Sequence, residues 1–327
     1  MPVFTSVSLL FDNSGGEEAR LKSEKMRWWA QVFSWVDAYQ VQATSSSEAV
    51  AWVRVVPIVL LHVIALVGLF VFDVSQIDIA VAVGLYLVRM FAITGFYHRY
   101  FAHKTFETSR GHQFFWACVA ASSGQRGPLW WAAHHRQHHR HTERQEDPHN
   151  ARKGLWWSHM GWFLCEKNFP TLSKQVPDLV KFPELIWLDR FDISMPVALA
   201  VLVYGLGAAL EAWAPGLGTN GLQMLFWGFL ISTMVLLHVT LSINSLAHRW
   251  GRRSYATSDD SRNSWWLALL TLGEGWHNNH HHYCGSTRQG FRWWQIDPSY
   301  YALWLMAKCR MVKDLREPPP HVVDARV

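Results

Sequence analysis

Charged residues are scarce in this sequence, which argues against an ordinary soluble protein. Only 17% of the 327 residues are Asp, Glu, Lys or Arg, against roughly 25% in a typical soluble domain, and 50% are hydrophobic. A mean hydropathy of -0.01 is nevertheless low for a chain made of membrane spans alone. We therefore expect the apolar residues to gather in membrane spans, beside a substantial part of the chain that is exposed to water.

Cysteine is also scarce, and its pattern excludes a disulfide-built fold. The four cysteines form no CxxC pair and no evenly spaced framework. We therefore expect free thiols, at Cys118, Cys165, Cys284 and Cys309.

Nucleic-acid and secretory signals are missing as well. The basic residues that give the net charge of +5 are scattered around Trp-rich segments, and no nucleic-acid-binding motif occurs. Attraction to anionic lipid headgroups and to acidic proteins explains this charge better, so no nucleic-acid partner is expected.

Residues 1–25 are polar, carry no secretory signal and are expected to be disordered, whereas residues 26–36 have the pattern of an interfacial helix.

Four apolar segments are candidate membrane spans, because a bilayer requires about 20 mostly apolar residues. The links between the first and second segments and between the third and fourth carry almost no Lys or Arg. Nearly all the positive charge lies elsewhere, so the positive-inside rule places both termini and the large central loop in the cytoplasm. The predicted spans are residues 55–72, 77–97, 193–210 and 222–243.

This pattern predicts an all-α integral-membrane protein with four transmembrane helices and a helical cytosolic cap. A polar N-terminal segment (residues 1–50) precedes the main domain (residues 51–310), and residues 311–327 form a C-terminal tail. Within the main domain, the cap comprises residues 98–192 and 244–310.

Histidine is abundant, with 18 residues, and eight of these form three recurring boxes. His98–His103 is an HxxxxH box at the end of the second predicted span, where the helix can end and turn its second histidine inward. Residues 135–139 and 277–281 are both HxxHH boxes. Positions i, i+3 and i+4 share one helix face, so each HxxHH predicts three imidazoles that point at one spot. The fourth helix should project into the cap and carry Asn244 and His248 on one face.

Nine histidines on one side of the membrane exceed what one metal ion requires. An all-imidazole ligand set suits Fe, Zn, Cu or Ni, but a structural zinc site is closed and normally has four ligands. The abundance therefore predicts a redox site of two metals that performs O2 chemistry on lipids. The candidate ligands are His98, His103, His135, His138, His139, His248, His277, His280 and His281.

The boxes, their order and their surroundings resemble the membrane fatty-acyl desaturases of the stearoyl-CoA desaturase type. The resemblance covers roughly residues 50–310, and the motif sequences are closer to those of bacterial members. It includes QRGPLWWAAHHRQHH at 125–139, DPHN at 147–150, SHMGW at 158–162, NSLAH at 244–248 and GEGWH at 273–277.

The resemblance implies two iron ions held by the nine histidines, with Asn244 contacting one iron through water. It also implies a kinked acyl tunnel beside the metals, lined by Gln125, Trp131, Trp162 and Thr240. These four residues favour a delta-9-type position. The implied reaction uses O2 and two electrons to place a cis double bond in a long saturated acyl chain.

Two departures from the family concern the acyl carrier and the electron donor. Animal members have an Arg-Asp pair before the second box that contacts the CoA headgroup, and this chain has Ala133 and His134 there. The acyl carrier therefore stays open between CoA, a membrane lipid and an acyl-carrier protein. No fused cytochrome b5 domain is expected, and electrons are therefore expected from a separate ferredoxin, rubredoxin or cytochrome b5.

The expected function is thus that of a multi-pass fatty-acyl desaturase with a cytoplasmic active site, in the bacterial inner membrane. A lipid or alkane hydroxylase on the same di-iron scaffold is the nearest alternative, and it differs in its product. A non-enzymatic membrane metal carrier belongs to another class and predicts a path of histidines within the spans. Only His62 and His238 lie well inside the predicted spans.

Overall fold

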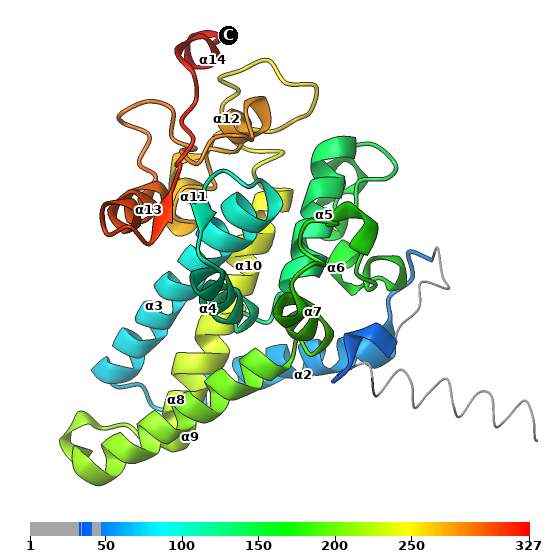
Figure 1. Ribbon diagram of the computed structural model, residues 1–327. Helices are drawn as coiled ribbons and strands as arrows, with labels where there is room; N and C mark the ends of the chain where they lie inside the picture. The colour runs from blue at the N-terminus through cyan, green and yellow to red at the C-terminus, as the bar shows by residue number, and fades with distance from the viewer. Residues whose placement is uncertain (1–32, 34, 41–46) are drawn as a thin grey trace, which may run out of the picture.

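The computed structural model of the chain describes residues 33, 35–40 and 47–327 and is almost entirely helical (Figure 1). Helices α8 and α9 lie at the bottom of this view, and α5, α12 and α14 lie towards the top. The predicted disordered segment (residues 1–25) lies outside the described residues, as does most of the predicted interfacial helix (residues 26–36).

Three helices in the described part of the chain are long and apolar enough to cross a membrane, and they correspond to the predicted second, third and fourth spans. The second and the fourth each contain a π-helical stretch. Their bounds are Gln76–Ala102 (α3, Gln76–Phe91, then η2, Ala92–Ala102), Ser194–Trp213 (α8) and Gly221–Ser245 (α9, Gly221–Met224, then η8, Leu225–Ile231, then α10, Ser232–Ser245).

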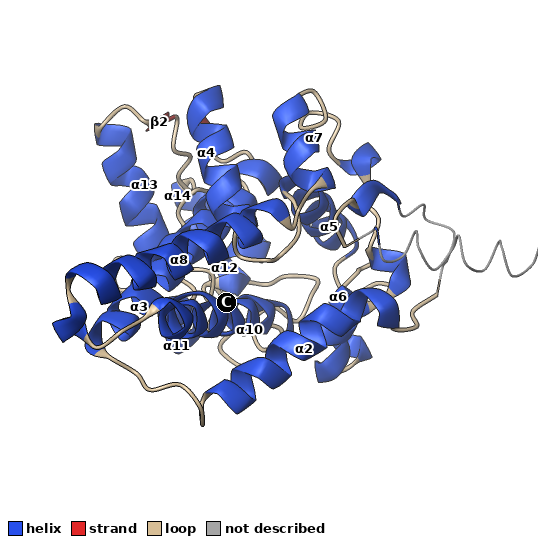
Figure 2. Ribbon diagram, turned by 90° about the horizontal axis from the view of Figure 1, so that it is seen from below, coloured by secondary structure: helices blue, strands red, loops and turns tan. Residues whose placement is uncertain are grey.

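The first predicted span, residues 55–72, forms a shorter helix, α2 (Trp52–Gly68). Its 17 residues extend about 25 Å at 1.5 Å per residue, which is less than the roughly 30 Å of a bilayer core. Its outward side chains are apolar, with Leu60 53% and Leu66 64% exposed. Figure 2 shows α2 and α13 (Pro298–Lys308) on opposite sides of the molecule.

Asp78 and Arg89 in the second span both face protein, which avoids the cost of a charge in lipid. Ser75 and Asp78 form a capping box at the start of α3, and Thr219 donates a hydrogen bond to the Asp78 carboxylate at 2.5 Å. Arg89 is buried and donates to the Thr233 hydroxyl at 2.7 Å. The Arg89 bond connects α3 to the fourth span, and the Asp78 bond connects α3 to the link before that span.

Short helices form the remainder of the fold, which corresponds to the predicted cap and tail. Two of them, α4 (Arg110–Ala121) and α7 (Pro183–Arg190), pack against α5 (Pro128–His141), which carries the second histidine box. The α-helical and π-helical segments are α4 (Arg110–Ala121), α5 (Pro128–His141), η4 (Trp157–Gly161), α6 (Trp162–Leu164), α7 (Pro183–Arg190), α11 (Trp265–Leu270), α12 (His277–His282), α13 (Pro298–Lys308) and α14 (Pro320–Asp324). The 3-10 helices are η1 (Ala38–Gln40), η3 (Ala151–Lys153), η5 (Glu166–Asn168), η6 (Ser173–Gln175) and η7 (Pro215–Leu217).

A two-stranded sheet is the exception to the all-helical prediction. Strands β1 (Glu107–Thr108) and β2 (Val312–Lys313) pair antiparallel, with Glu107 opposite Lys313 and Thr108 opposite Val312. Strand β2 belongs to the predicted tail, so this part of the tail is paired with the cap.

A buried ion-pair network fixes the end of the second span against the segment that precedes the third histidine box. Arg99 of η2 is 1% exposed, and its Nη2 atom lies 3.0 Å from Glu274 Oε1 and 2.9 Å from Asp297 Oδ1. Breaking a buried ion pair by removing one partner typically costs about 3–5 kcal/mol. The network therefore holds two histidine-bearing segments in a fixed relation.

We expect Gly207→Ala to destabilise the protein and Gly205→Ala to leave its stability nearly unchanged. A Cβ atom on Gly207 of α8 would lie 2.5 Å from both the Asn220 carbonyl oxygen and the Met224 Cβ, whereas one on Gly205 would meet nothing within 4 Å. Overpacking of this kind costs about 1–3 kcal/mol. Thermal unfolding of the two variants in one detergent measures the difference, and equal Tm values would contradict the close packing of α8 on α9.

Candidate metal centre

The first histidine box lies in a π-helix. The sequence predicted that the second span would end near Tyr97, but the helix continues to Ala102 with a widened turn. In a π-helix each N–H bonds to the carbonyl five residues earlier, and the His103 N–H bonds to the His98 carbonyl at 3.2 Å. The widened turn therefore brings the two rings of HxxxxH together edge to face, with centroids 4.8 Å apart, whereas a regular α-helix would place them on different faces.

The two HxxHH boxes lie on α5 and α12, as their spacing predicted. The prediction that each box points three imidazoles at one spot is wrong. In α5, His135 and His139 face one group of ligands and His138 faces another; in α12 the i+3 histidine, His280, joins the group of His135. In both boxes the i and i+4 histidines stay in one group and the i+3 histidine joins the other group, so each box divides its histidines between two sites.

All nine candidate histidines come together in two groups, in each of which the potential ligand atoms lie within 4.8 Å of one another. The groups adjoin, because the ring centroids of His139 and His281 are 4.6 Å apart. The five-histidine group consists of His98, His103, His135, His139 and His280. The four-histidine group consists of His138, His248, His277 and His281.

The spacing of the ring nitrogens fits metal ions. Every one of the nine Nε2 atoms faces another at 2.8–3.4 Å, for example 2.8 Å between His103 and His135 and 3.0 Å between His248 and His277. With metal–nitrogen bonds of about 2.1 Å, as for zinc, two neighbouring ligands at right angles lie about 3 Å apart. The two groups therefore have the spacing that metal coordination requires.

Four carboxylates select the ring nitrogen that faces each group. A carboxylate can only accept, so the Nδ1 atom carries the proton and the Nε2 lone pair is left for a metal. His138 and His281 both have this arrangement, and their Nε2 atoms face each other at 3.4 Å without a proton to share. Such facing lone pairs need a cation between them. The four contacts are His98–Glu274 (2.6 Å), His138–Asp147 (2.9 Å), His248–Glu143 (3.1 Å) and His281–Asp259 (2.8 Å).

Burial keeps the cap histidines neutral, as metal ligands must be. Burial lowers the pKa of each ring well below its usual value, and the neighbouring histidines lower it further. Imidazoles of this kind keep their lone pairs available at neutral pH. The pKa is lowered in this way for His103, His135, His138, His139, His277 and His280.

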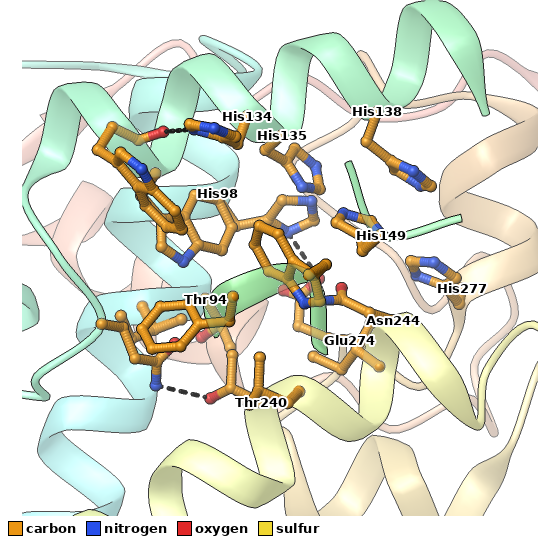
Figure 3. Close-up of a pocket in the computed structure, with 18 residues that line it drawn as sticks. Thr94, His98, His134, His135, His138, His149, Thr240, Asn244, Glu274 and His277 are labelled. Carbon is orange, nitrogen blue, oxygen red and sulfur yellow. Dashed lines mark hydrogen bonds and ion pairs between the residues drawn. The ribbon is translucent and has the colours of Figure 1, made fainter. Parts of the chain in front are cut away.

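A pocket adjoins both groups (Figure 3). His134, His135 and His138 of α5 line it on one side, and Thr240 and Asn244 of α10 line the opposite side. All four residues predicted to line an acyl tunnel, Gln125, Trp131, Trp162 and Thr240, lie in its wall. The structure thus brings the predicted substrate residues and metal ligands to one place.

Known proteins match this chain over most of its length. Residues 77–310 match the family model described as fatty acid desaturase. The chain is 34% identical over 283 residues to the sn-2 palmitoyl-lipid 9-desaturase of Nostoc sp. (strain 36), covering 84% of this chain and 93% of the relative. It is 30% identical over 318 residues to the sn-1 stearoyl-lipid 9-desaturase of Synechocystis sp., covering 96% and 94%. The acyl-CoA 5-desaturase AL21 of Anemone leveillei is 32% identical over 291 residues, covering 85% and 86%.

The chain belongs to the fatty acid desaturase family. It is therefore an oxidoreductase that desaturates fatty-acyl chains. Membership of an enzyme family also rules against the alternative of a non-enzymatic metal carrier.

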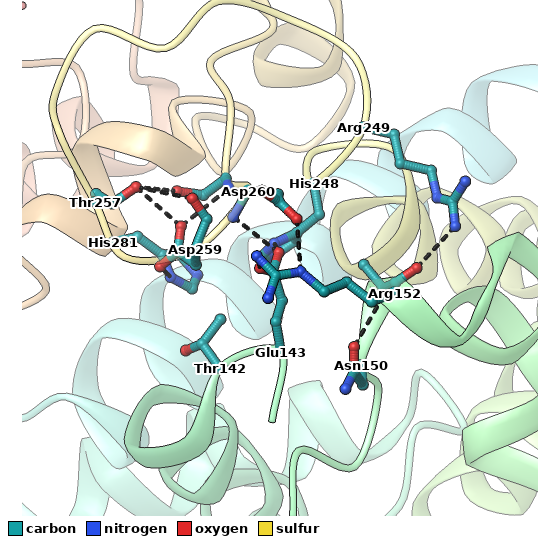
Figure 4. Close-up of polar contacts among 12 residues, drawn as sticks. Thr142, Glu143, Asn150, Arg152, His248, Arg249, Thr257, Asp259, Asp260 and His281 are labelled. Atoms are coloured by element: carbon teal, nitrogen blue, oxygen red, sulfur yellow. Dashed lines mark hydrogen bonds and ion pairs between the residues drawn. The ribbon is translucent and has the colours of Figure 1, made fainter. Parts of the chain in front are cut away.

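One predicted ligand of the desaturase reaches its group in an unexpected way. The sequence placed His248 on a continuing fourth helix, but α10 ends at Ser245 and His248 lies in the turn that follows. The Glu143 carboxylate accepts from its Nδ1 atom, and Arg152 in turn pairs with Glu143 at 2.9 Å (Figure 4). A loop histidine is thus oriented by a carboxylate from the end of α5 rather than by helical spacing.

The carboxylates themselves were missed by sequence reasoning. Asp147 and Glu274 lie inside two of the strings that carry the family resemblance, but Glu143 and Asp259 lie outside them. Burial acts to raise the pKa of Asp259, yet hydrogen bonds from His281 and Ser261 overcome this and hold it well below its usual range. Asp259 is therefore charged at neutral pH and can hold the His281 proton on Nδ1.

Proposed function

We propose that this desaturase inserts a cis double bond at the delta-9 position of a long saturated acyl chain carried by a membrane lipid. The observation that supports this most is the pair of adjoining histidine groups beside a largely apolar pocket. The reaction consumes one O2, two electrons and two protons, removes two hydrogens from adjacent carbons, and releases two waters.

We propose that each histidine group holds one iron ion. The donor set supports this, because all-imidazole ligation with charged carboxylates behind it suits a redox metal better than a closed structural site. Asn244 lines the pocket together with His277, so it is the residue that can hold a water against the four-histidine group. When bound, the irons would activate O2, which is the oxidant of the reaction.

The pocket residues position the chain and exclude water. The Gln125 amide donates to the Thr240 hydroxyl at 3.1 Å and so connects the loop before α5 to α10. The indole rings of Trp131 and Trp162 lie in the same wall, and Trp131 stacks on His135 with ring centroids 5.0 Å apart. An acyl chain beside these rings would present its carbons to the histidine groups.

The acyl carrier is proposed to be a glycerolipid. Two of the relatives described above are named as acyl-lipid 9-desaturases, whereas the Anemone relative is named for acyl-CoA and position 5. Ala133 and His134 stand where animal members have the CoA-contacting pair. The His134 ring is buried and donates from Nδ1 to its own helix, at the Trp130 carbonyl, so it presents no charge for a CoA phosphate.

The membrane arrangement is proposed as in the sequence analysis. Helix α2 would be the first of four spans, supported by its apolar exposed side chains, and residues 98–192 and 244–310 would form the cytosolic cap. Both termini would then be cytoplasmic, and a bacterial inner membrane is the proposed location. Electrons would come from a separate ferredoxin, rubredoxin or cytochrome b5.

Fatty-acid analysis of a desaturase-deficient host that expresses this chain tests the proposal. Gas chromatography–mass spectrometry with double-bond derivatisation should show a new delta-9 monounsaturated acid, found in the glycerolipid fraction. The His280→Ala variant should give none, and His112→Ala, which alters a histidine outside both groups, should give the normal amount. A hydroxylated product would identify a hydroxylase instead, and a product confined to acyl-CoA would reject the lipid carrier.

A further inference from the structure

A second pocket lies behind the third histidine box and is separate from the acyl pocket. Its volume is about 550 Å³, and none of its lining residues lines the acyl pocket. Trp276, which directly precedes the ligand His277, lies in its wall. Four tryptophans and two arginines line it, and no Asp or Glu of the described chain does. The proposed reaction uses none of these side chains.

The two arginines, Arg252 and Arg326, bring positive charge to this pocket from distant parts of the chain. A β-bridge holds Arg252 opposite Asn263, and a second bridge holds the backbone of Arg326. Among the described residues, neither guanidinium makes a hydrogen bond or an ion pair. Asp324, two residues before Arg326, pairs with another arginine at 3.5 Å. Both positive charges are therefore available to a ligand.

The neutral polar side chains of the pocket also have donors to spare within the described chain. The Ser254 hydroxyl accepts from the Asn263 amide at 3.1 Å, so its own proton is left to donate. The Gln295 carbonyl oxygen accepts from the Asn279 amide and from the Arg292 N–H, so its NH2 group is left as well. Two guanidinium groups and free donors without a carboxylate suit an anion that has several acceptor oxygens, such as a phosphate.

An apolar surface borders the pocket and continues to the second span. Trp265 and Trp294 of the pocket wall are 67% and 51% exposed, and Leu269 and Leu270 are exposed further along α11. Tyr86 of the second span donates a hydrogen bond to the Leu270 carbonyl at 2.6 Å, so α11 lies against α3 (Figure 1). Tryptophan is favoured where apolar lipid meets water. The basic pocket thus opens beside a surface that suits lipid chains.

We propose that this pocket binds the headgroup of an anionic membrane phospholipid. Arg252 and Arg326 hold the phosphate, and the acyl chains lie over Trp265 and Leu269. A free phosphate ion would satisfy the arginines but would leave the exposed indole and leucine side chains uncovered, so the lipid is the occupant that both halves of the surface fit. This lipid is not the substrate, because its pocket is separate from the acyl pocket.

A bound headgroup would also stabilise the third histidine box. Asn263 of the pocket wall donates to the Asn279 side-chain oxygen at 2.6 Å and accepts from the Asn278 N–H at 3.0 Å. Asn278 and Asn279 lie inside the box, on α12. A ligand that orders the wall therefore orders the segment that carries three ligand histidines.

The test measures binding of phosphatidylglycerol to the whole protein, purified in a non-ionic detergent, by native mass spectrometry. The double variant Arg252→Gln/Arg326→Gln should bind its first phosphatidylglycerol roughly tenfold more weakly and should bind phosphatidylcholine as the wild type does. The matched control is Lys308→Gln/Arg310→Gln, which removes the same charge at the exposed end of α13 and should alter affinity less than twofold. Equal losses in both double variants, or no loss in either, would overturn the proposal.

Thermal unfolding in the same detergent separates the lipid from a free anion and from a structural role of the arginines. Phosphatidylglycerol should raise the Tm of the wild type and of the control variant by roughly 2–4 °C, and should not raise that of Arg252→Gln/Arg326→Gln. If inorganic phosphate at millimolar concentration raised the wild-type Tm as much, the occupant would be a free anion and the lipid would be rejected. A lower Tm of Arg252→Gln/Arg326→Gln without lipid would show that the arginines support the fold, and would count against the site.

Discussion

Replacing His103 with alanine should abolish desaturation and let a chelator remove one of two irons while the other stays bound. His103 belongs only to the five-histidine group, and its Nε2 atom lies 2.8 Å from that of His135. Loss of one imidazole weakens the group to which it belongs, because metal affinity depends on the number of correctly oriented donors. The measurement is the amount of iron that stays bound to the protein as the chelator concentration rises, determined by mass spectrometry of the protein's metal content.

The reciprocal variant, in the four-histidine group, tests whether the two histidine groups are separate metal sites. His277→Ala should also abolish desaturation, but the iron that becomes labile should be that of the four-histidine group. The double variant should then lose both irons, and His112→Ala should keep both together with full activity. If His103→Ala and His277→Ala alone each released both irons at one chelator concentration, the two groups would not be separate sites.

Asp259→Asn should weaken metal binding in the four-histidine group about 10–100-fold, with a matching loss of activity. One oxygen of Asp259 accepts from His281 Nδ1 at 2.8 Å, and the other accepts from the Ser261 N–H at 3.0 Å. An amide has a single acceptor oxygen, so its NH2 group would face one of these donors. His281 would then lose the bond that fixes its ring and keeps its Nε2 lone pair towards the metal.

The adjacent acid provides the matched control. Asp260 pairs with Arg152 near the surface and makes no contact with a ligand histidine among the described residues (Figure 4). Asp260→Asn should therefore change iron affinity less than twofold. Competition with a chromophoric chelator measures both variants, and similar affinities for Asp259→Asn and Asp260→Asn would show that the carboxylate behind His281 does not support the metal.

The parts of this structure that depend on local spacing could be predicted from the sequence. Apolar runs predicted the second, third and fourth spans, and the HxxHH spacing predicted helices at both boxes. The burial of Asp78 was not predicted, because it depends on hydrogen bonds from Thr219 in the link before the fourth span and from Gln223 at the start of that span. The first span was predicted too long because the residues after Gly68 are apolar, although the chain turns there.

The division of the histidines could not be predicted, because it depends on how separate helices meet. A single helix shows that i, i+3 and i+4 share a face, but only the packing of α5 against α12 and η2 separates His138 from His135 and His139. The π-helical turn of η2 has no clear signal in the sequence, because an apolar span of this composition is equally compatible with a regular α-helix. The carboxylates behind the rings come from loops that have no periodicity.

The measurement that tests the two-metal account most directly is anomalous diffraction from crystals of the purified desaturase at the iron absorption edge. The account predicts two iron peaks, one surrounded by the five-histidine group and one by the four-histidine group, with Asn244 beside the second. A single peak shared by histidines of both groups, or peaks that appear only at the zinc edge, would contradict it.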